Sequence, residues 1–256
     1  GSRAVEVTLR AGERLEIALF FSRAAEMYQR ALPHAQDPGQ REALLDKLAS
    51  LLEMTGELDR ALAHATELQE LRPLDPEVGL RVTNIQLMRD DFQAADQALT
   101  RVELLVDAQA HATRAPELRA QVLSRRAEVH LLRGDANSAL DTALTALACC
   151  VELEQTARVA PLRISLLNTV GKLRLTLGQG EAARQDLDQA LTLARDAGRV
   201  DHELRALGLL GHLELTGGAY AAAEAWYQQA RTLARQVGEH RLLGVYLQHL
   251  GVLAER

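Results

Sequence analysis

The sequence predicts an all-α protein, a superhelical solenoid of helix-turn-helix repeats, and two observations support this prediction. First, one hydrophobic pattern recurs along the chain at intervals of 37, 34, 44, 44 and 40 residues, marked by Ala24, Ala61, Ala95, Ala139, Ala183 and Ala223. Repetition at such a period is the signature of stacked structural units. Second, no run of β-branched residues is bounded by turn residues, so we expect no strand.

The repeats are expected at residues 5–38, 42–75, 76–109, 120–155, 164–198 and 204–238, with one extra helix at 244–256. Counting each repeat from its first residue places the recurring alanine at repeat position 20. The first helices are expected to begin near Val5, Glu42, Pro76, Ala120, Ile164, Leu204 and Gly244. This arrangement predicts a single repeat domain over residues 3–256.

Small residues mark the predicted turn and crossing of each helix pair. A glycine stands five residues before the alanine in four copies, at Gly56, Gly134, Gly178 and Gly218. Glycine at the end of a helix permits backbone angles that other residues avoid. Alanine at the crossing lets two antiparallel helices approach within about 8–10 Å. Pro116 and Pro161 precede the fourth and fifth repeats, where each is expected to open a lengthened first helix.

Small residues at repeat positions 8, 20 and 27 resemble the pattern of the tetratricopeptide repeat. The pattern is complete in three copies, which carry Gly12, Ala24 and Ala31, then Gly171, Ala183 and Ala190, then Gly211, Ala223 and Ala230. Departures occur at position 8 (Ala49, Thr83, Ala127) and position 27 (Leu68, Val102), and the consensus tryptophan is missing. The long periods resemble those of kinesin light chains and of the sensor arrays of bacterial signal-transduction ATPases and kinase–ATPase fusions.

The resemblance implies that the first helices line a concave, peptide-binding surface, chiefly at positions 2, 5, 6, 9, 12 and 13. Position 6 carries a cation in four successive repeats, and other polar residues occupy inner positions nearby. The candidate binding residues are therefore Arg10, Lys47, Arg81, Asn84, Arg125, Asn168, Lys172, Arg205 and His212. A basic stripe of this kind would suit an acidic peptide, a C-terminal carboxylate or a phosphorylated tail.

Two observations limit this interpretation. The cations alternate with acids such as Glu6, Asp46 and Glu128, so the alternative is a solvated helix face with internal ion pairs. The carboxylate clamp of chaperone-binding family members pairs lysine with asparagine in successive repeats. Asn84 fits one such place, but Arg125 stands where the next asparagine would be, so a chaperone-tail binder is not supported.

Other classes of function find no support in the sequence. It contains no phosphate loop, dinucleotide fingerprint, Cys-x-x-Cys or His-Glu-x-x-His motif, so we expect no enzyme, cofactor or metal site. A net charge of −6 opposes nucleic-acid binding, and no apolar stretch approaches the ~20 residues of a membrane span. Cys149 and Cys150 are neighbours on a predicted helix and are expected to be free thiols, which favours a reducing, cytoplasmic compartment.

The remaining features concern the origin and role of the chain. Gly1 and Ser2 are interpreted as a cloning remnant, so we expect a fragment of a larger protein. The two lysines against 27 arginines indicate a GC-rich, bacterial genome. The apolar helix 244–256 is expected to continue into further repeats, to cap the array by self-association, or to be an imperfect terminal cap.

We therefore expect a scaffold that binds a protein or peptide, as the sensor or docking region of a larger bacterial regulator. The alternatives are an autoregulatory or oligomerisation module and a small-peptide receptor of the quorum-sensing type.

Overall fold

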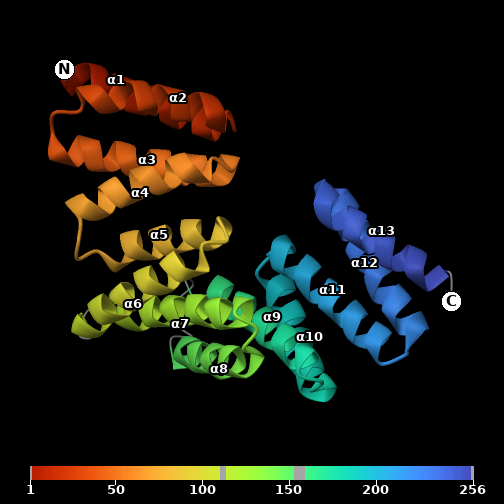
Figure 1. The fold of residues 1–256 in the computed structure, drawn as a ribbon. Coiled ribbons are helices and arrows are strands. Elements are labelled where there is room, and N and C mark those ends of the chain that lie inside the picture. The colour runs from red at the N-terminus through yellow and green to blue at the C-terminus, as the bar shows by residue number, and fades with distance from the viewer. Residues whose placement is uncertain (1, 110–113, 153–158, 255–256) are drawn as a thin grey trace. The chain divides into compact units, whose positions relative to one another are not determined.

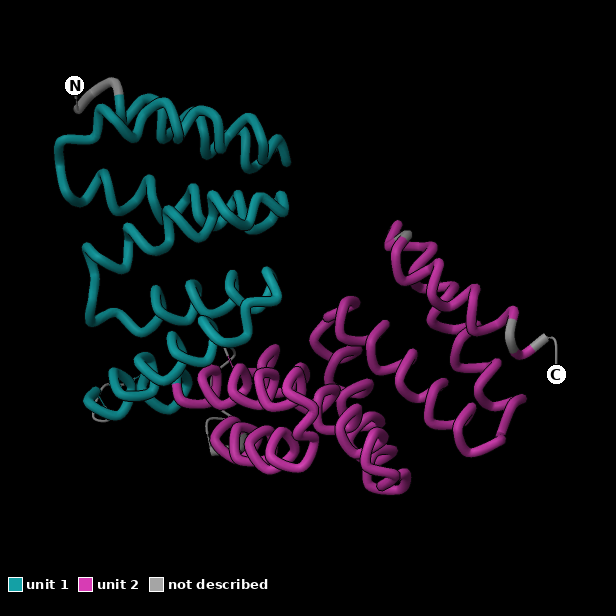
Figure 2. The backbone as a smooth tube through the Cα atoms, in the orientation of Figure 1, with its two compact units in different colours: residues 1–118 teal, residues 119–256 magenta. Residues whose placement is uncertain are grey.

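The computed structural model describes residues 2–109, 114–152 and 159–254 and contains only helices and turns in these ranges. The predicted all-α class is thus confirmed. Contacts divide the chain into two compact units, residues 1–118 and 119–256, drawn in teal and magenta in Figure 2. Within each unit, consecutive helices pack against one another in chain order and run antiparallel (Figure 1). The prediction of one domain over residues 3–256 stays a prediction.

Unit 1 consists of three helix pairs and the start of a seventh helix. The elements are α1 (Ser2–Ile17), α2 (Phe21–Ala31), the short 3₁₀ helix η1 (Leu32–His34), α3 (Pro38–Thr55), α4 (Leu58–Leu71), α5 (Pro76–Met88) and α6 (Phe92–Ala108). Helix α7 (Ala115–Leu132) begins in unit 1 and continues into unit 2.

Unit 2 continues the same alternation of first and second helices. After α7 it contains α8 (Ala136–Glu152), α9 (Ala160–Thr176), α10 (Gly180–Asp196), α11 (Val200–Thr216), α12 (Tyr220–Val237) and α13 (His240–Ala254). Helices α7, α9 and α11 are the first helices of their repeats, and α13 follows as the extra helix.

Most first helices begin several residues before their predicted starts. Helix α9 begins at Ala160 rather than Ile164, α11 at Val200 rather than Leu204, and α13 at His240 rather than Gly244. A 34-residue unit leaves no room for the additional N-terminal turn that the longer periods supply. Pro116 and Pro161 are the second residues of α7 and α9, which confirms that each opens a lengthened helix.

The turn between the two helices has the same geometry in all six repeats. Repeat position 15 adopts a left-handed conformation at Gly56, Gly134, Gly178 and Gly218, with φ between 73° and 81°. Leu19 and Asp90 occupy the same position in the first and third repeats, with φ of 61° and 58°. In every copy the next backbone N–H donates to the carbonyl five residues before it, as Glu57 does to Leu52 at 2.9 Å. This hydrogen bond is the signature of a Schellman motif.

Aspartates at the following position cap the second helices. The carboxylate of Asp91 accepts from the backbone N–H of Ala94 at 3.1 Å, and that of Asp135 accepts from Ser138 at 3.1 Å. Asp91 is therefore the N-cap residue of α6. Asp90 instead takes the left-handed position, which short polar residues tolerate better than most.

Close approach of the paired helices explains the recurring small residues. All six alanines at repeat position 20 are fully buried. At position 8, a Cβ added to Gly211 would lie 2.7 Å from the ring of Tyr227, and one added to Gly171 would lie 2.6 Å from the side chain of Leu187. These glycines therefore accept a large side chain from the second helix of the same repeat, at repeat position 24.

The left-handed turn position predicts opposite effects at two equivalent sites. Gly56→Ala should lower the free energy of unfolding by about 1 kcal/mol, because a non-glycine residue is strained there. No atom lies within 4 Å of an added Cβ, so packing makes no contribution. Leu19→Gly should raise the same free energy slightly, since Leu19 is 72% exposed and loses little packing. Urea unfolding measures both, and a lower midpoint for Leu19→Gly would contradict the assignment.

The crossing position predicts a graded series in α12. Ala223 is fully buried, Ala222 is partly buried and Ala221 is exposed. Ala223→Leu should therefore destabilise the protein by roughly 1–3 kcal/mol, because the added volume forces two helices apart. Ala222→Leu should cost less and Ala221→Leu least. Thermal unfolding of the three variants tests the order, and equal midpoints would show that position 20 is not the crossing point.

Candidate functional site

A concave pocket of about 850 Å³ opens on the first-helix face of unit 2. Helices α9 and α11 both contribute residues at repeat positions 2, 5, 6 and 9, as expected for an inner face. We call this site the unit 2 pocket, and it is lined by Ser124, Arg125, Glu128, Leu131, Ser165, Asn168, Thr169, Lys172, Arg205, Gly208, Leu209, His212, Tyr227, Leu242, Val245, Tyr246 and His249. Its volume lies in the range of about 300–1,000 Å³ typical of small-ligand sites.

Five of the nine predicted binding residues meet in this pocket: Arg125, Asn168, Lys172, Arg205 and His212. The guanidinium of Arg125 donates to the carboxylate of Glu128 at 3.0 Å, so its charge is balanced within the pocket. Lys172 and Arg205 are exposed and form no ion pair with any carboxylate in the described ranges. The pocket therefore presents two uncompensated positive charges.

Asn168 lines the pocket and is fully buried. Its side-chain Nδ2 donates to the backbone carbonyl of His202 at 3.2 Å, which ties α9 to the start of α11. Its Oδ1 is buried and has no hydrogen-bond partner among the described residues. Because the Nδ2 contact fixes the orientation of the amide, Oδ1 is left as a free acceptor.

Tyr227 reaches the pocket from α12 and was not among the predicted residues. Its ring is fully buried against Gly211, and burial raises its pKa to about 12. The phenol oxygen has no hydrogen-bond partner in the described structure. The imidazole of His249 stacks on the ring, with centroids 4.8 Å apart and planes inclined by 9°.

Helix α13 forms one wall of the pocket. The hydroxyl of Tyr246 donates to the carbonyl of Leu204 at 2.7 Å, which anchors α13 to α11. A Cβ added to Gly208 would lie 3.0 Å from the Tyr246 ring, so glycine at this position lets the ring pack closely on α11. The sequence contains a signal for this wall, because the repeat register continues into the extra helix. Counted from Gly244, His249 stands at repeat position 6, which is an inner position.

The four remaining predicted residues lie in unit 1, on α1, α3 and α5. Arg10 pairs with Glu6 at 2.7 Å, Arg81 with Asp46 at 2.5 Å, and Lys47 with Glu16 at 3.2 Å. These ion pairs match the alternative weighed above, a helix face with internal ion pairs. The fourth residue, Asn84, is half-buried, and its Oδ1 has no hydrogen-bond partner in the described ranges. A ligand role for these residues stays a prediction.

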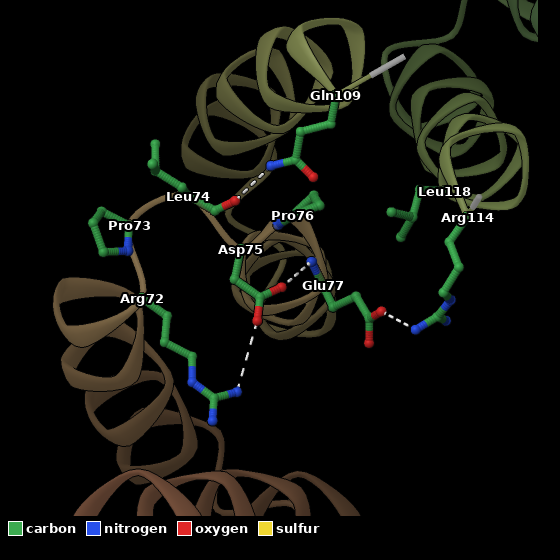
Figure 3. A pocket seen from close by; sticks show the side chains of 9 residues that line it. All are labelled: Arg72, Pro73, Leu74, Asp75, Pro76, Glu77, Gln109, Arg114 and Leu118. Atoms are coloured by element: carbon green, nitrogen blue, oxygen red, sulfur yellow. Dashed lines mark hydrogen bonds and ion pairs between the residues drawn. The ribbon is translucent and has the colours of Figure 1, made fainter. Parts of the chain in front are cut away.

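A second pocket, of about 580 Å³, surrounds the loop between α4 and α5 in unit 1 (Figure 3). Its polar groups are satisfied by one another. Gln109 donates to the carbonyl of Leu74 at 2.9 Å, Arg114 pairs with Glu77, and Asp75 accepts from the backbone N–H of Glu77 at 3.0 Å. These contacts fix the loop and leave little free hydrogen-bonding capacity, so the unit 2 pocket is the stronger candidate.

The described residues hold no group of three or more His, Cys, Asp and Glu side chains that could bind a metal ion. Cys149 is half-buried and Cys150 buried, and both are free, as the sequence predicted. Burial raises the pKa of the Cys150 thiol to about 11, so it is not a reactive thiolate. None of the described helices has the length and apolar character needed to cross a bilayer.

The chain has the fold of a tetratricopeptide repeat solenoid, as the sequence pattern predicted. Residues 162–236, from α9 through most of α12, match the tetratricopeptide repeat family model. A search of the curated proteins gives no significant match.

Three solved structures illustrate the similarity, each at 16% identity. A tetratricopeptide repeat protein from Parabacteroides merdae has a TM-score of 0.66, with 95% of this chain and 84% of that chain covered. A signal-transduction ATPase with numerous domains and a tetratricopeptide repeat sensor, from Pyrococcus horikoshii, has a TM-score of 0.71, with 97% of this chain and 38% of that chain covered. The Cut9–Hcn1 heterotetramer of the APC/C has a TM-score of 0.70, with 95% of this chain and 43% of that chain covered. At this identity the similarity establishes the fold.

Three half-buried histidines predict how stability depends on pH. Burial is the largest cause that lowers the pKa of His64, His202 and His249, and neighbouring His212 lowers that of His249 further. In the unfolded chain the histidine pKa is about 6.5. Below that pH the unfolded chain therefore binds more protons than the folded chain. The free energy of unfolding should therefore fall as the pH decreases from about 6.5, while remaining constant above it.

Urea unfolding at about pH 7.5 and about pH 5.5 tests this expectation, in a range above most carboxyl pKa values. His249→Gln should reduce the difference between the two midpoints, because it removes one of the three groups. A wild-type midpoint that rises at the lower pH would contradict the proposed environments of these histidines.

Proposed function

We propose that this protein is a binding scaffold that holds an acidic segment of a partner protein on its first-helix face, with the unit 2 pocket as the centre of the site. The observation that supports this most directly is the pair Lys172 and Arg205, which line one pocket without a carboxylate partner in the described structure. A carboxylate brought by a partner would form charge-assisted hydrogen bonds with both. A preformed groove would also reduce the ordering cost of binding.

The setting we propose is the sensor or docking region of a larger bacterial cytoplasmic regulator. The Pyrococcus horikoshii ATPase, whose tetratricopeptide repeat sensor is part of a longer chain, supports this as an analogy of fold. This chain spans 38% of that protein. The partner in such a setting would be either another protein or a segment of the same polypeptide.

A second candidate, self-association through α13, rests on a separate observation. Leu247 and Val245 are large apolar residues on this helix and are 46% and 40% exposed. A second copy or a further repeat could bury them. Analytical ultracentrifugation of the protein and of Leu247→Glu measures this, and a monomer in both cases would rule out α13 as a self-association surface.

The test of the scaffold is charge reversal in the pocket. Lys172→Glu with Arg205→Glu is preferred to reversal of Arg81 and Arg125, because those two residues already pair with Asp46 and Glu128. The probe is a fluorescein-labelled peptide of alternating glutamate and serine, measured by fluorescence anisotropy at low salt. Wild type should bind it, and the double variant should bind at least about tenfold more weakly, since two charge-assisted contacts become repulsive.

The matched control is Arg101→Glu with Arg235→Glu. Both arginines are exposed, lie on the second helices α6 and α12, and have no ion-pair partner in the described structure. This control changes the net charge by the same amount and should leave most of the affinity intact. Equal weakening by the two double variants would mean that net charge alone governs binding, and the groove would no longer be supported.

A further inference from the structure

Two buried tyrosines occupy the same repeat position in different units, and only one has its hydroxyl satisfied. Tyr28 and Tyr227 are both at repeat position 24, and each packs against a position 8 glycine, Gly12 or Gly211. The hydroxyl of Tyr28 donates to the carboxylate of Glu16. The residue of the sixth repeat that corresponds to Glu16 is Leu215, which offers no acceptor. The phenol of Tyr227 therefore lacks the partner that its counterpart has.

Asn168 provides a second unsatisfied group in the same pocket. Its Oδ1 and the Tyr227 oxygen are both buried without a partner, and both residues are fully buried and line the unit 2 pocket. Leaving a buried polar group unpaired costs about 1–3 kcal/mol. Two such groups on residues that line one pocket are therefore the groups that a ligand would satisfy.

The chemistry of each group restricts what the ligand carries. An amide oxygen only accepts, so the group that meets Asn168 must be a donor such as an N–H. Lys172 and Arg205 require an anion. The phenol of Tyr227 can donate to a carbonyl or carboxylate oxygen of the same ligand.

The remaining surface of the pocket selects the rest of the ligand. Leu209, Leu242 and Val245 from α11 and α13 supply an apolar wall, and His249 covers the Tyr227 ring beside them. The ligand should thus have one carboxylate that meets the two cations and an apolar substituent that packs on this wall.

We propose that the unit 2 pocket binds an acylated amino acid with an apolar side chain and a free carboxylate. Its carboxylate meets Lys172 and Arg205, its amide N–H meets Asn168, and the Tyr227 hydroxyl donates to one of its oxygens. This proposal rests on the proposed binding function and names its ligand chemistry. The same chemistry occurs at the C-terminus of a peptide and in a free acylamino acid, and the experiment separates these two sources.

The first measurement compares four small probes by isothermal titration calorimetry. N-acetyl-L-leucine should bind. N-acetyl-L-leucinamide lacks the carboxylate, 2-acetoxy-4-methylpentanoate lacks the N–H, and N-acetyl-L-glutamate replaces the apolar side chain by an acidic one. Each of these three should bind about tenfold more weakly or not at all, because one required contact is lost. Equal binding of N-acetyl-L-leucine and its amide or ester analogue would overturn the assignment.

The second measurement uses two matched tyrosine variants. Tyr227→Phe removes a hydroxyl that has no partner in the folded protein, so it should leave the melting temperature unchanged or raise it. It should weaken binding of N-acetyl-L-leucine by about tenfold. Tyr28→Phe removes a satisfied hydroxyl and should lower the melting temperature with no effect on binding. The proposal is overturned if Tyr227→Phe binds like wild type, or if it loses as much stability as Tyr28→Phe.

The third measurement identifies the source of the ligand. A short glycine–serine peptide ending in leucine is compared with its C-terminally amidated form and with N-acetyl-L-leucine. Tighter binding of the free-ended peptide than of N-acetyl-L-leucine supports a protein C-terminus, and the reverse order supports a free acylamino acid. Equal binding of the free-ended and amidated peptides contradicts recognition of the carboxylate.

These probes also separate this proposal from the binding function on which it rests. If the glutamate–serine peptide binds through Lys172 and Arg205 but no leucine probe binds, the scaffold stands and this ligand class is wrong. If neither the acidic peptide nor a leucine probe binds, both proposals are wrong.

Discussion

Close approach of the two helices within each repeat is the constraint on which the rest of this structure depends. Small residues at the crossing make it possible, since Ala24, Ala61, Ala95, Ala139, Ala183 and Ala223 are all fully buried. A larger side chain there would separate the helices. Once the pair is close, the position 8 residue faces position 24 of the second helix, and the glycines there accept rings as large as those of Tyr28 and Tyr227. The first helices are thereby held in parallel rows, which places their inner positions side by side.

The same packing produces the candidate site. Helices α9 and α11 are the first helices of successive repeats, so their inner positions lie on one face. Asn168 and Lys172 are one helical turn apart on α9, and Arg205 on α11 lines the same pocket. In unit 1 the equivalent face carries cations that are matched by carboxylates from the same or the neighbouring first helix, such as Arg81 with Asp46. In unit 2 this face carries fewer acidic residues, and Lys172 and Arg205 have no ion-pair partner in the described ranges. One architecture thus yields a self-neutralised face in one unit and a positively charged pocket in the other.

Much of this was readable from the sequence because local rules govern it. The spacing of the alanines gave the repeat frame, and the Schellman turns formed even where Leu19 and Asp90 replace glycine, because the neighbouring helices impose the left-handed conformation. The first helices started earlier than predicted, since a fixed 34-residue unit omits the extra turn opened by Pro116 and Pro161. Five of the nine predicted binding residues share a pocket because they follow the inner positions of successive helices.

The sequence by itself determined the all-α class, the repeat frame, the turns and the face on which the inner residues lie, because each depends on the periodicity of helices and on residue size. Only the tertiary structure decided which cations are neutralised, that Tyr227 and Asn168 carry unsatisfied buried atoms, and that α13 supplies Tyr246 and His249 as a wall. The reason is physical. Ion pairing and hydrogen-bond satisfaction depend on atoms brought together from different repeats, at distances that no local sequence pattern encodes.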